Sequence, residues 1–134
     1  MILSNLQKVR KVNNNAVVWV DIPVLDLLRA ADFYIAVLDR EVDITELDEM
    51  TFATIGHSDG SGGCLYPDSD HVPAENGPLV YFNVDGRLEE AVERCVKMGG
   101  KVVQDTRQIG KFGMRAVIKD SEGNKIALHS TTDS

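Results

Sequence analysis

Apolar and polar positions alternate over residues 16–24 with a period of two, which is typical of a half-buried β-strand. The apolar side of this segment carries Val18, Val20, Ile22 and Val24. Asp26 follows, and its carboxylate suits a helix N-cap because it can accept hydrogen bonds from the first backbone N–H groups. Apolar residues then recur at helical spacing, at Leu28, Ala31, Ile35 and Leu38. The pattern predicts a strand that leads directly into a helix, with Phe33, Tyr34 and this apolar stripe in the core.

The rest of the chain carries signals of the same kind. Further strands are predicted in the first half over 41–47, 50–55 and 64–67. Residues 68–77 show no periodicity and contain Pro73 and Gly77, which indicates a linker. The second half predicts a strand over 79–84, a helix over 88–98, and strands over 101–104, 114–119 and 125–130. DSEGN at 120–124 is interpreted as a tight turn.

The two halves repeat one plan at an offset of 60 residues. The matched pairs are Val20 and Val80, Ile22 and Phe82, Val24 and Val84, Leu28 and Leu88, Ala31 and Ala91, and Val42 and Val102. Repetition at this period favours two β-α-β-β-β modules, 16–67 and 78–130, in a single domain that spans 1–134. A helix covers only one face of so small a sheet, so something else must cover the other. The predicted fold class is α+β, with two curved sheets that enclose a cleft.

The composition excludes several classes of function. The chain has 134 residues, 43% of them hydrophobic and 26% charged, as in an ordinary soluble protein. No apolar run reaches the roughly 20 residues of a membrane span, and the N-terminus lacks a secretory signal, so no membrane partner is expected. Cys64 and Cys95 fit no disulfide framework or CxxC spacing, which favours a cytoplasmic protein. The net charge of −7 argues against a nucleic-acid partner.

The most acidic stretch is EVDITELDEM at 41–50. Two interpretations remain open: a solvated face, or a negative field that attracts a cationic small molecule. On this charge balance, a ligand is expected to be cationic or neutral.

Several segments together resemble the vicinal oxygen chelate superfamily, which includes glyoxalase I, bleomycin-resistance proteins and extradiol dioxygenases. They are DLLRAADFYIAVL at 26–38, GGCLYP at 62–67, GPLVYFNVD at 77–85, MGGKVV at 98–103 and GMRAVIKDSEGNKIALHS at 113–130. The resemblance covers about residues 16–130 and is strongest to small glyoxalase-like members. It implies paired βαβββ modules, a U-shaped cavity between them and, usually, a homodimer.

The resemblance also bears on a metal. Metalloenzymes of the superfamily hold a divalent ion with His, Glu or Gln, two from each module. The corresponding positions here are Trp19, Leu79, Ala127, and either Gly63 or Cys64. Indole, isobutyl and methyl groups donate no electron pair, and one thiol is too few for a site that needs about three protein ligands. We therefore expect no metal and no other cofactor, and an organic ligand in its place. His57 and His71 are predicted to be exposed and do not restore a metal site.

Strand alternation directs two groups of side chains toward the predicted cleft. They are Trp19, Asp21 and Pro23 from the first module and Leu79, Tyr81 and Asn83 from the second. Further candidates for ligand binding are Cys64, Arg115, Ala127 and His129. An apolar and aromatic wall with a few polar groups is typical of small-molecule sites. Alternatively, Trp19 and Leu79 fill the space left by the metal.

The candidates for acid–base catalysis are His129, Tyr81 and Asp21. Histidine changes its charge near neutral pH, so His129 is either a general base or a rim residue with a backbone partner. In the segment 109–115, Lys111 and Arg115 are placed to meet an anionic group, and Gly110 and Gly113 would let the loop hinge.

Three hypotheses of function follow. The first is a metal-independent protein that binds a small organic molecule in the cleft, with or without acid–base chemistry. The second is a metal-dependent lyase or dioxygenase of the same superfamily. The third is a non-catalytic structural or partner-binding module whose cavity is filled by Trp19, Leu79 and Tyr81. The linker is long enough to pair the modules within one chain or to swap them between two.

Overall fold

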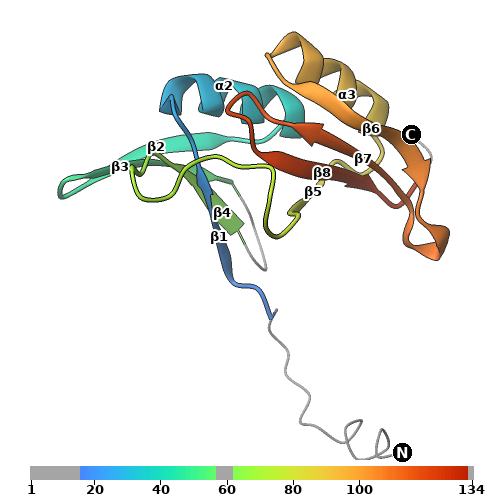
Figure 1. The fold of residues 1–134 in the computed structure, drawn as a ribbon, viewed down its shortest axis with the longest axis horizontal. Coiled ribbons are helices and arrows are strands. Elements are labelled where there is room, and N and C mark those ends of the chain that lie inside the picture. The colour runs from blue at the N-terminus through green and yellow to red at the C-terminus, as the bar shows by residue number, and fades with distance from the viewer. Residues whose placement is uncertain (1–15, 57–61, 133–134) are drawn as a thin grey trace, which may run out of the picture.

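The computed structural model describes residues 16–56 and 62–132 of the chain. The first half contains β1 (Trp19–Pro23), α2 (Leu27–Leu38), β2 (Val42–Leu47), β3 (Met50–Ile55) and β4 (Gly62–Tyr66) (Figure 1). The second half contains β5 (Tyr81–Asn83), α3 (Leu88–Lys97), β6 (Lys101–Gln108), the 3-10 turn η1 (Gly110–Phe112), β7 (Met114–Lys119) and β8 (Lys125–Ser130). Each half begins with a strand that leads into a helix, as the hydrophobic pattern predicted.

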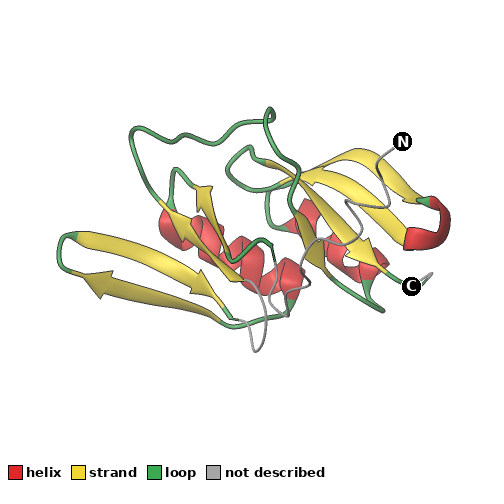
Figure 2. Ribbon diagram, turned by 90° about the horizontal axis from the view of Figure 1, so that it is seen from below, coloured by secondary structure: helices red, strands yellow, loops and turns green. Residues whose placement is uncertain are grey.

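The strands form two four-stranded sheets of equivalent topology, with the orders β1-β4-β3-β2 and β5-β8-β7-β6. In each sheet the first strand lies at the edge and runs parallel to its neighbour, and the remaining pairs are antiparallel. This arrangement confirms the predicted α+β class with two βαβββ modules. The sheets are curved but do not close on each other (Figure 2).

Both helices lie on the same side of the molecule, where they cover one face of each sheet (Figures 1 and 2). They also pack against each other, so the two modules share one core. The largest fully buried side chains of this core are Tyr34, Phe33, Leu65, Leu88, Ile118 and Leu128. We call the face of each sheet that points away from the helices its open face. In the described parts of the chain no helix covers it.

The start of α2 follows the sequence prediction, but part of its apolar stripe does not. Asp26 caps the helix by accepting a hydrogen bond of 3.0 Å from the backbone N–H of Arg29. The buried residues are Ala30, Ala31, Phe33, Tyr34, Val37 and Leu38. The expectation that Leu28 and Ile35 belong to the core is wrong, since they are 68% and 43% exposed. The helix buries an arc centred on Tyr34, and these two residues lie on its flank.

Some element boundaries also differ from those predicted. The strand expected over 79–84 is shortened to β5, Tyr81–Asn83, because only these residues pair with β8, its one neighbour. The strand expected over 101–104 extends to Gln108 as β6. Its second half pairs with β7 through two irregularities of register, and its mostly polar residues give no alternation that a sequence pattern could detect.

The turn at 120–124 joins the second module to the first. The hydroxyl of Tyr34 donates to Asp120 Oδ2 over 2.6 Å, and Asn124 Nδ2 donates to the carbonyl of Pro23 over 2.8 Å. Glu122 Oε1 accepts from the backbone N–H groups of Leu25 and Asp26, each at 2.8 Å, just before the first turn of α2. The sequence predicted a turn here, and the structure adds an anchor between modules.

Two arginines, Arg87 at the N-cap of α3 and Arg94 within the helix, make a second connection. Arg87 donates to the carbonyl of Val37 and Arg94 to that of Ala36, both over 2.9 Å. Carbonyls in the last turn of a helix have no partner within the helix, so cationic donors stabilise that end of α2. Contacts at both ends of α2 therefore fix how the modules sit within the chain. Across residues 16–56 and 62–132 there is no helix long and apolar enough to cross a membrane.

Candidate functional site

The open face of the first sheet brings together three residues that the sequence analysis selected. Asp21 of β1 pairs with Cys64 of β4, so their side chains project on the same face as Trp19. The indole Nε1 of Trp19 donates to Asp21 Oδ1 over 3.1 Å, and Cys64 Sγ donates to the same oxygen over 3.2 Å. Trp19 remains 41% exposed. We call these three residues the indole–carboxylate cluster.

The thiol of Cys64 is held in its protonated form. Burial raises its pKa to about 11, and the hydrogen bond to Asp21 adds to this effect. A thiol must lose its proton to act as a nucleophile or as a metal ligand. The indole–carboxylate cluster therefore offers a ligand surface rather than a reactive sulfur.

The open face of the second sheet collects Tyr81, Arg115 and His129. Arg115 of β7 pairs with His129 of β8. Tyr81 of β5 pairs with Ala127, which lies two residues before His129 on β8 and therefore on the same face. A guanidinium nitrogen of Arg115 donates to the Tyr81 hydroxyl, and the Arg115 Cζ lies 5.8 Å from the centroid of the Tyr81 ring. We call Tyr81, Arg115 and His129 the arginine cluster.

His129 is oriented by the loop that precedes β7. Its Nε2 lies 2.5 Å from the carbonyl oxygen of Phe112, and its ring centroid lies 6.1 Å from that of Tyr81. Gly113 makes this contact possible, because it has a φ of 98° and a side chain there would meet the carbonyl oxygen of Ser130 at 2.3 Å. The interpretation of His129 as a rim residue with a backbone partner matches this geometry.

A recess of about 570 Å³ lies over the arginine cluster. Its lining is formed by Tyr81, Ile109, Phe112, Arg115 and His129. Three of these five residues were selected from the sequence, and Ile109 and Phe112 were missed because the loop shows no periodicity. Lys111, which was expected to meet an anionic group, does not line this recess; its Nζ lies 5.5 Å from the Phe112 ring centroid.

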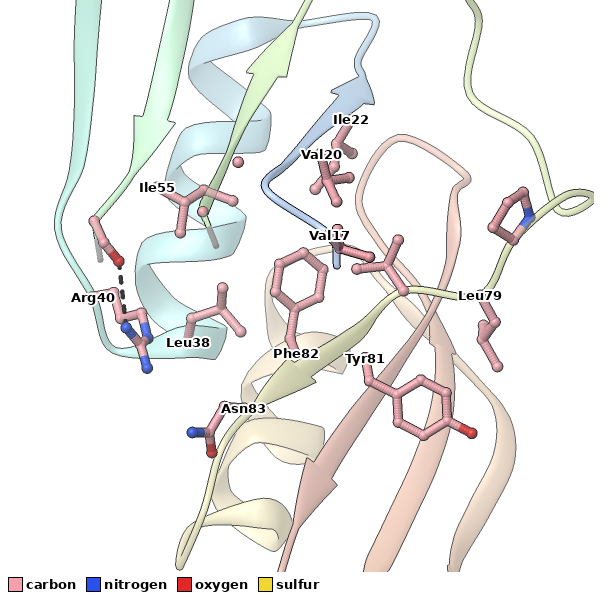
Figure 3. A pocket seen from close by; sticks show the side chains of 15 residues that line it. Val17, Val20, Ile22, Leu38, Arg40, Ile55, Leu79, Tyr81, Phe82 and Asn83 are labelled. Atoms are coloured by element: carbon pink, nitrogen blue, oxygen red, sulfur yellow. Dashed lines mark hydrogen bonds between the residues drawn. The ribbon is translucent and has the colours of Figure 1, made fainter. Parts of the chain in front are cut away.

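A second recess, of about 760 Å³, follows the seam between β1 and β5 (Figure 3). Val20 and Ile22 line it from the first module, and Val80 and Phe82, their partners in the 60-residue repeat, line it from the second module. Leu79, Tyr81 and Asn83 also belong to its lining, whereas Ala127, which shares the open face with Tyr81, is fully buried. Arg40 stands at the edge of the recess and donates to the Gly56 carbonyl over 3.3 Å.

A third recess, of about 360 Å³, lies beside the indole–carboxylate cluster and was not predicted from the sequence. His71 of the linker lines it together with Trp19 and Asp21. His71 is exposed, as predicted. His57 lies outside the described residues.

The positions that correspond to the superfamily's metal ligands do not suit a divalent ion. They are occupied by Trp19, Leu79, Ala127, and either Gly63, which has no side-chain donor, or Cys64, whose thiol is protonated. Within the described part of the chain, no group of three or more His, Cys, Asp or Glu residues is placed to hold a metal. We therefore assign no metal-dependent step to this site.

Comparison with known proteins supports the same fold. Residues 17–129 match the family model described as a glyoxalase-like domain. No curated protein matches the chain. Among solved structures, hypothetical protein SA1046 from S. aureus has a TM-score of 0.69 at 17% identity, covering 94% of this chain and 99% of that chain.

Two further structures carry functional names. A glyoxalase-related enzyme from Fulvimarina pelagi has a TM-score of 0.66 at 16% identity, with 87% of this chain and 88% of that chain covered. The fosfomycin resistance protein FosX from Listeria monocytogenes has a TM-score of 0.66 at 14% identity, with 89% and 91% covered. At identities this low, the likeness concerns the fold alone.

Proposed function

The chain belongs to the family of glyoxalase-like domains, and from this premise we propose that it binds a small organic molecule on the open faces of its two sheets, without a divalent metal. The observation that carries this proposal is the recess over the arginine cluster. An apolar wall with a few convergent polar groups is how small-molecule sites are usually built. Here Ile109 and Phe112 supply the apolar part, and the arginine cluster supplies the polar groups.

The exposure of the aromatic residues favours a ligand wall over a filled cavity. Trp19 is 41% exposed and Tyr81 is 45% exposed. Side chains that plugged a closed cleft would be buried against each other. This observation counts against a purely structural module, and it leaves part of each aromatic side chain exposed to a ligand.

Acid–base chemistry is the catalytic form of the proposal. If the His129 Nε2 donates to the Phe112 carbonyl, the neutral imidazole has Nδ1 as its acceptor, and this nitrogen would serve as a general base. The Tyr81 hydroxyl accepts from Arg115, so its own proton remains for a hydrogen bond to a ligand. Asp21 already accepts from Trp19 and Cys64, which suits an orienting role.

The first experiment is native mass spectrometry of the purified chain, with elemental analysis of the same sample, after incubation with a metabolite extract. We expect a metal-free protein that retains an organic molecule. Tyr81→Leu should abolish retention, whereas Tyr66→Leu should preserve it, because Tyr66 lines none of the three recesses. The same spectra test the predicted homodimer.

Two results would overturn the proposal. A stoichiometric divalent ion in the purified protein would favour the hypothesis of a metal-dependent lyase or dioxygenase. A folded wild-type chain that retains no molecule from the extract would favour the structural or partner-binding module.

A further inference from the structure

We propose that the open face of the second sheet recognises the carboxylate of a small organic acid, with Arg115 and Arg107 as its cationic groups. The inference rests on the proposed function, because it names the chemical class of the ligand for the same recess. It differs from the expectation of a cationic or neutral ligand that the net charge suggested.

Strand register places three basic side chains and one amide in a row. Arg107 of β6 pairs with Arg115 of β7, Arg115 pairs with His129 of β8, and His129 pairs with Asn83 of β5. Directly paired residues project on the same face of a sheet, and like charges directly opposite each other are unfavourable. Two arginines in this position are repelled by each other unless an anion lies between or above them.

Arg115 has unused capacity to bind an anion. Its NH1 donates to the Tyr81 hydroxyl and its NH2 donates to Gln104 Oε1 over 3.3 Å, so both of these partners are neutral groups. Its Nε is buried and donates to no acceptor in the described structure. A buried donor without a partner is costly, so the side chain would gain if the guanidinium turned to present Nε to a bound carboxylate.

The ion pairs recorded among residues 16–56 and 62–132 involve neither Arg107 nor Arg115. The Asp85 carboxylate interacts electrostatically with His129. Its Oδ1 already accepts hydrogen bonds from the backbone N–H and hydroxyl of Thr131 and from the hydroxyl of Ser130. Asp105 lies on β6 close to Arg107 in sequence and forms no recorded ion pair with either arginine. Within the described chain, therefore, no ion pair offsets the positive charges of Arg107 and Arg115.

The surroundings of the row favour a carboxylate on an apolar body. A planar guanidinium matches the geometry of a carboxylate and can donate two parallel hydrogen bonds to it. The Tyr81 ring, Phe112 and Ile109 form the apolar part of the same recess. An aromatic or aliphatic acid would place its carboxylate on the arginines and its hydrocarbon part on these side chains.

The net charge of −7 does not oppose this assignment. At physiological ionic strength, charges further apart than about 8 Å are largely screened. Contacts within the recess therefore decide the sign of the ligand, and the acidic stretch 41–50 lies on β2 and β3 of the other sheet.

The test compares three probes of nearly the same shape: benzoate, the neutral benzamide and the cationic benzylammonium. Each is titrated into the isotopically labelled full chain, and amide shifts are followed by NMR at low and physiological salt. We expect benzoate to bind about tenfold to a hundredfold more tightly than benzamide, as charge-assisted hydrogen bonds imply. Benzylammonium should not bind, and benzoate affinity should fall as salt rises.

Substitutions assign the effect to the row. Arg115→Gln should remove the preference for benzoate over benzamide, and Arg107→Gln should reduce it several-fold. Within the described residues Arg107 makes no ion pair or side-chain hydrogen bond, so its loss should leave folding intact even if Arg115→Gln unfolds the chain. Lys97→Gln on α3 makes the same change of net charge on the opposite side of the sheet and should leave benzoate binding unchanged.

Each other outcome overturns the inference in a distinct way. Equal binding of benzoate and benzamide would show a ligand site without anion recognition, and the proposed function would stand. Tighter binding of benzylammonium would support the expectation from net charge. Failure of all three probes to bind would refute carboxylate recognition here, while the metabolite-extract experiment would still decide the proposed function. Loss of benzoate binding in Lys97→Gln would indicate a general charge effect.

Discussion

Substitution of Glu122 gives the sharpest test of the contact between the two modules. Its side chain is fully buried and accepts from two backbone N–H groups near the start of α2. It also pairs with Arg29 through two hydrogen bonds, Nε to Oε2 over 2.7 Å and NH2 to Oε1 over 2.9 Å. Glu122→Gln keeps the shape of the side chain but removes the charge and turns an amide NH₂ or a weaker carbonyl acceptor toward these donors.

Two arguments give the loss in the free energy of unfolding that Glu122→Gln should cause. Burial raises the pKa of Glu122, but hydrogen bonds from Arg29, Asp26, Ser121 and Leu25 outweigh it and lower the pKa to about 2, from the usual 4.5. At about 1.4 kcal/mol per pKa unit, the charged form contributes about 3 kcal/mol to folding. Removal of one partner of a buried ion pair typically costs about 3–5 kcal/mol. We therefore expect Glu122→Gln to lower the free energy of unfolding by about 3 kcal/mol at pH 7.

The contribution of Glu122 to the free energy of unfolding should depend on pH. Because the folded pKa lies below the unfolded one, the contribution of Glu122 is complete above about pH 4.5 and disappears as the pH falls toward 2. Urea unfolding followed by circular dichroism at several pH values should show wild type and Glu122→Gln converging at low pH. Glu93→Gln, on the exposed surface of α3, is the matched control and should behave as wild type. A difference below about 0.5 kcal/mol at pH 7, or one that persists at pH 2, would refute this reasoning.

Three further predictions test local features. Asp26→Ala removes the N-cap of α2 and should cost about 1 kcal/mol in urea unfolding, and an unchanged unfolding midpoint would show that the cap contributes nothing. Cys64, with a pKa of about 11, should react with iodoacetamide at pH 8 about two orders of magnitude more slowly than a free cysteine, as measured by peptide mass spectrometry. Asp21→Asn should speed the reaction, because it removes a carboxylate that raises this pKa. A reaction rate typical of free cysteine would contradict the geometry. Gly113→Ala should lower the melting temperature and shift the His129 ring resonances, because a side chain there collides with the Ser130 carbonyl; a native spectrum would show that the loop adapts freely.

The open-face residues illustrate how far strand alternation reaches. A period of two fixes which side chains share a face, so the sequence could place Trp19 and Asp21 on one face of their strand, and Tyr81 and Asn83 on one face of theirs. Alternation does not say which residues of neighbouring strands lie opposite each other. That Cys64 donates to Asp21, and that Arg107, Arg115 and His129 form one row, follows from register, which depends on pairing between distant segments.

The apolar stripe of α2 shows that helical periodicity does not decide which apolar residues are buried. Helical spacing correctly predicted a helix, but the sequence contains more apolar positions than the helix buries. Which of them enter the core is decided by where the sheet and α3 touch the helix, and Leu28 and Ile35 fall outside that contact.

By itself, the sequence determined the element order, the repeated module, the N-cap at Asp26 and the two-sided character of the strands, because these depend on periodicity and local backbone chemistry. Only the tertiary structure decided that the turn at 120–124 anchors one module to the other, that His129 meets the Phe112 loop, and that the two edge strands form an apolar recess. Such contacts join residues up to about a hundred positions apart, and no local pattern records a pairing that long-range packing creates.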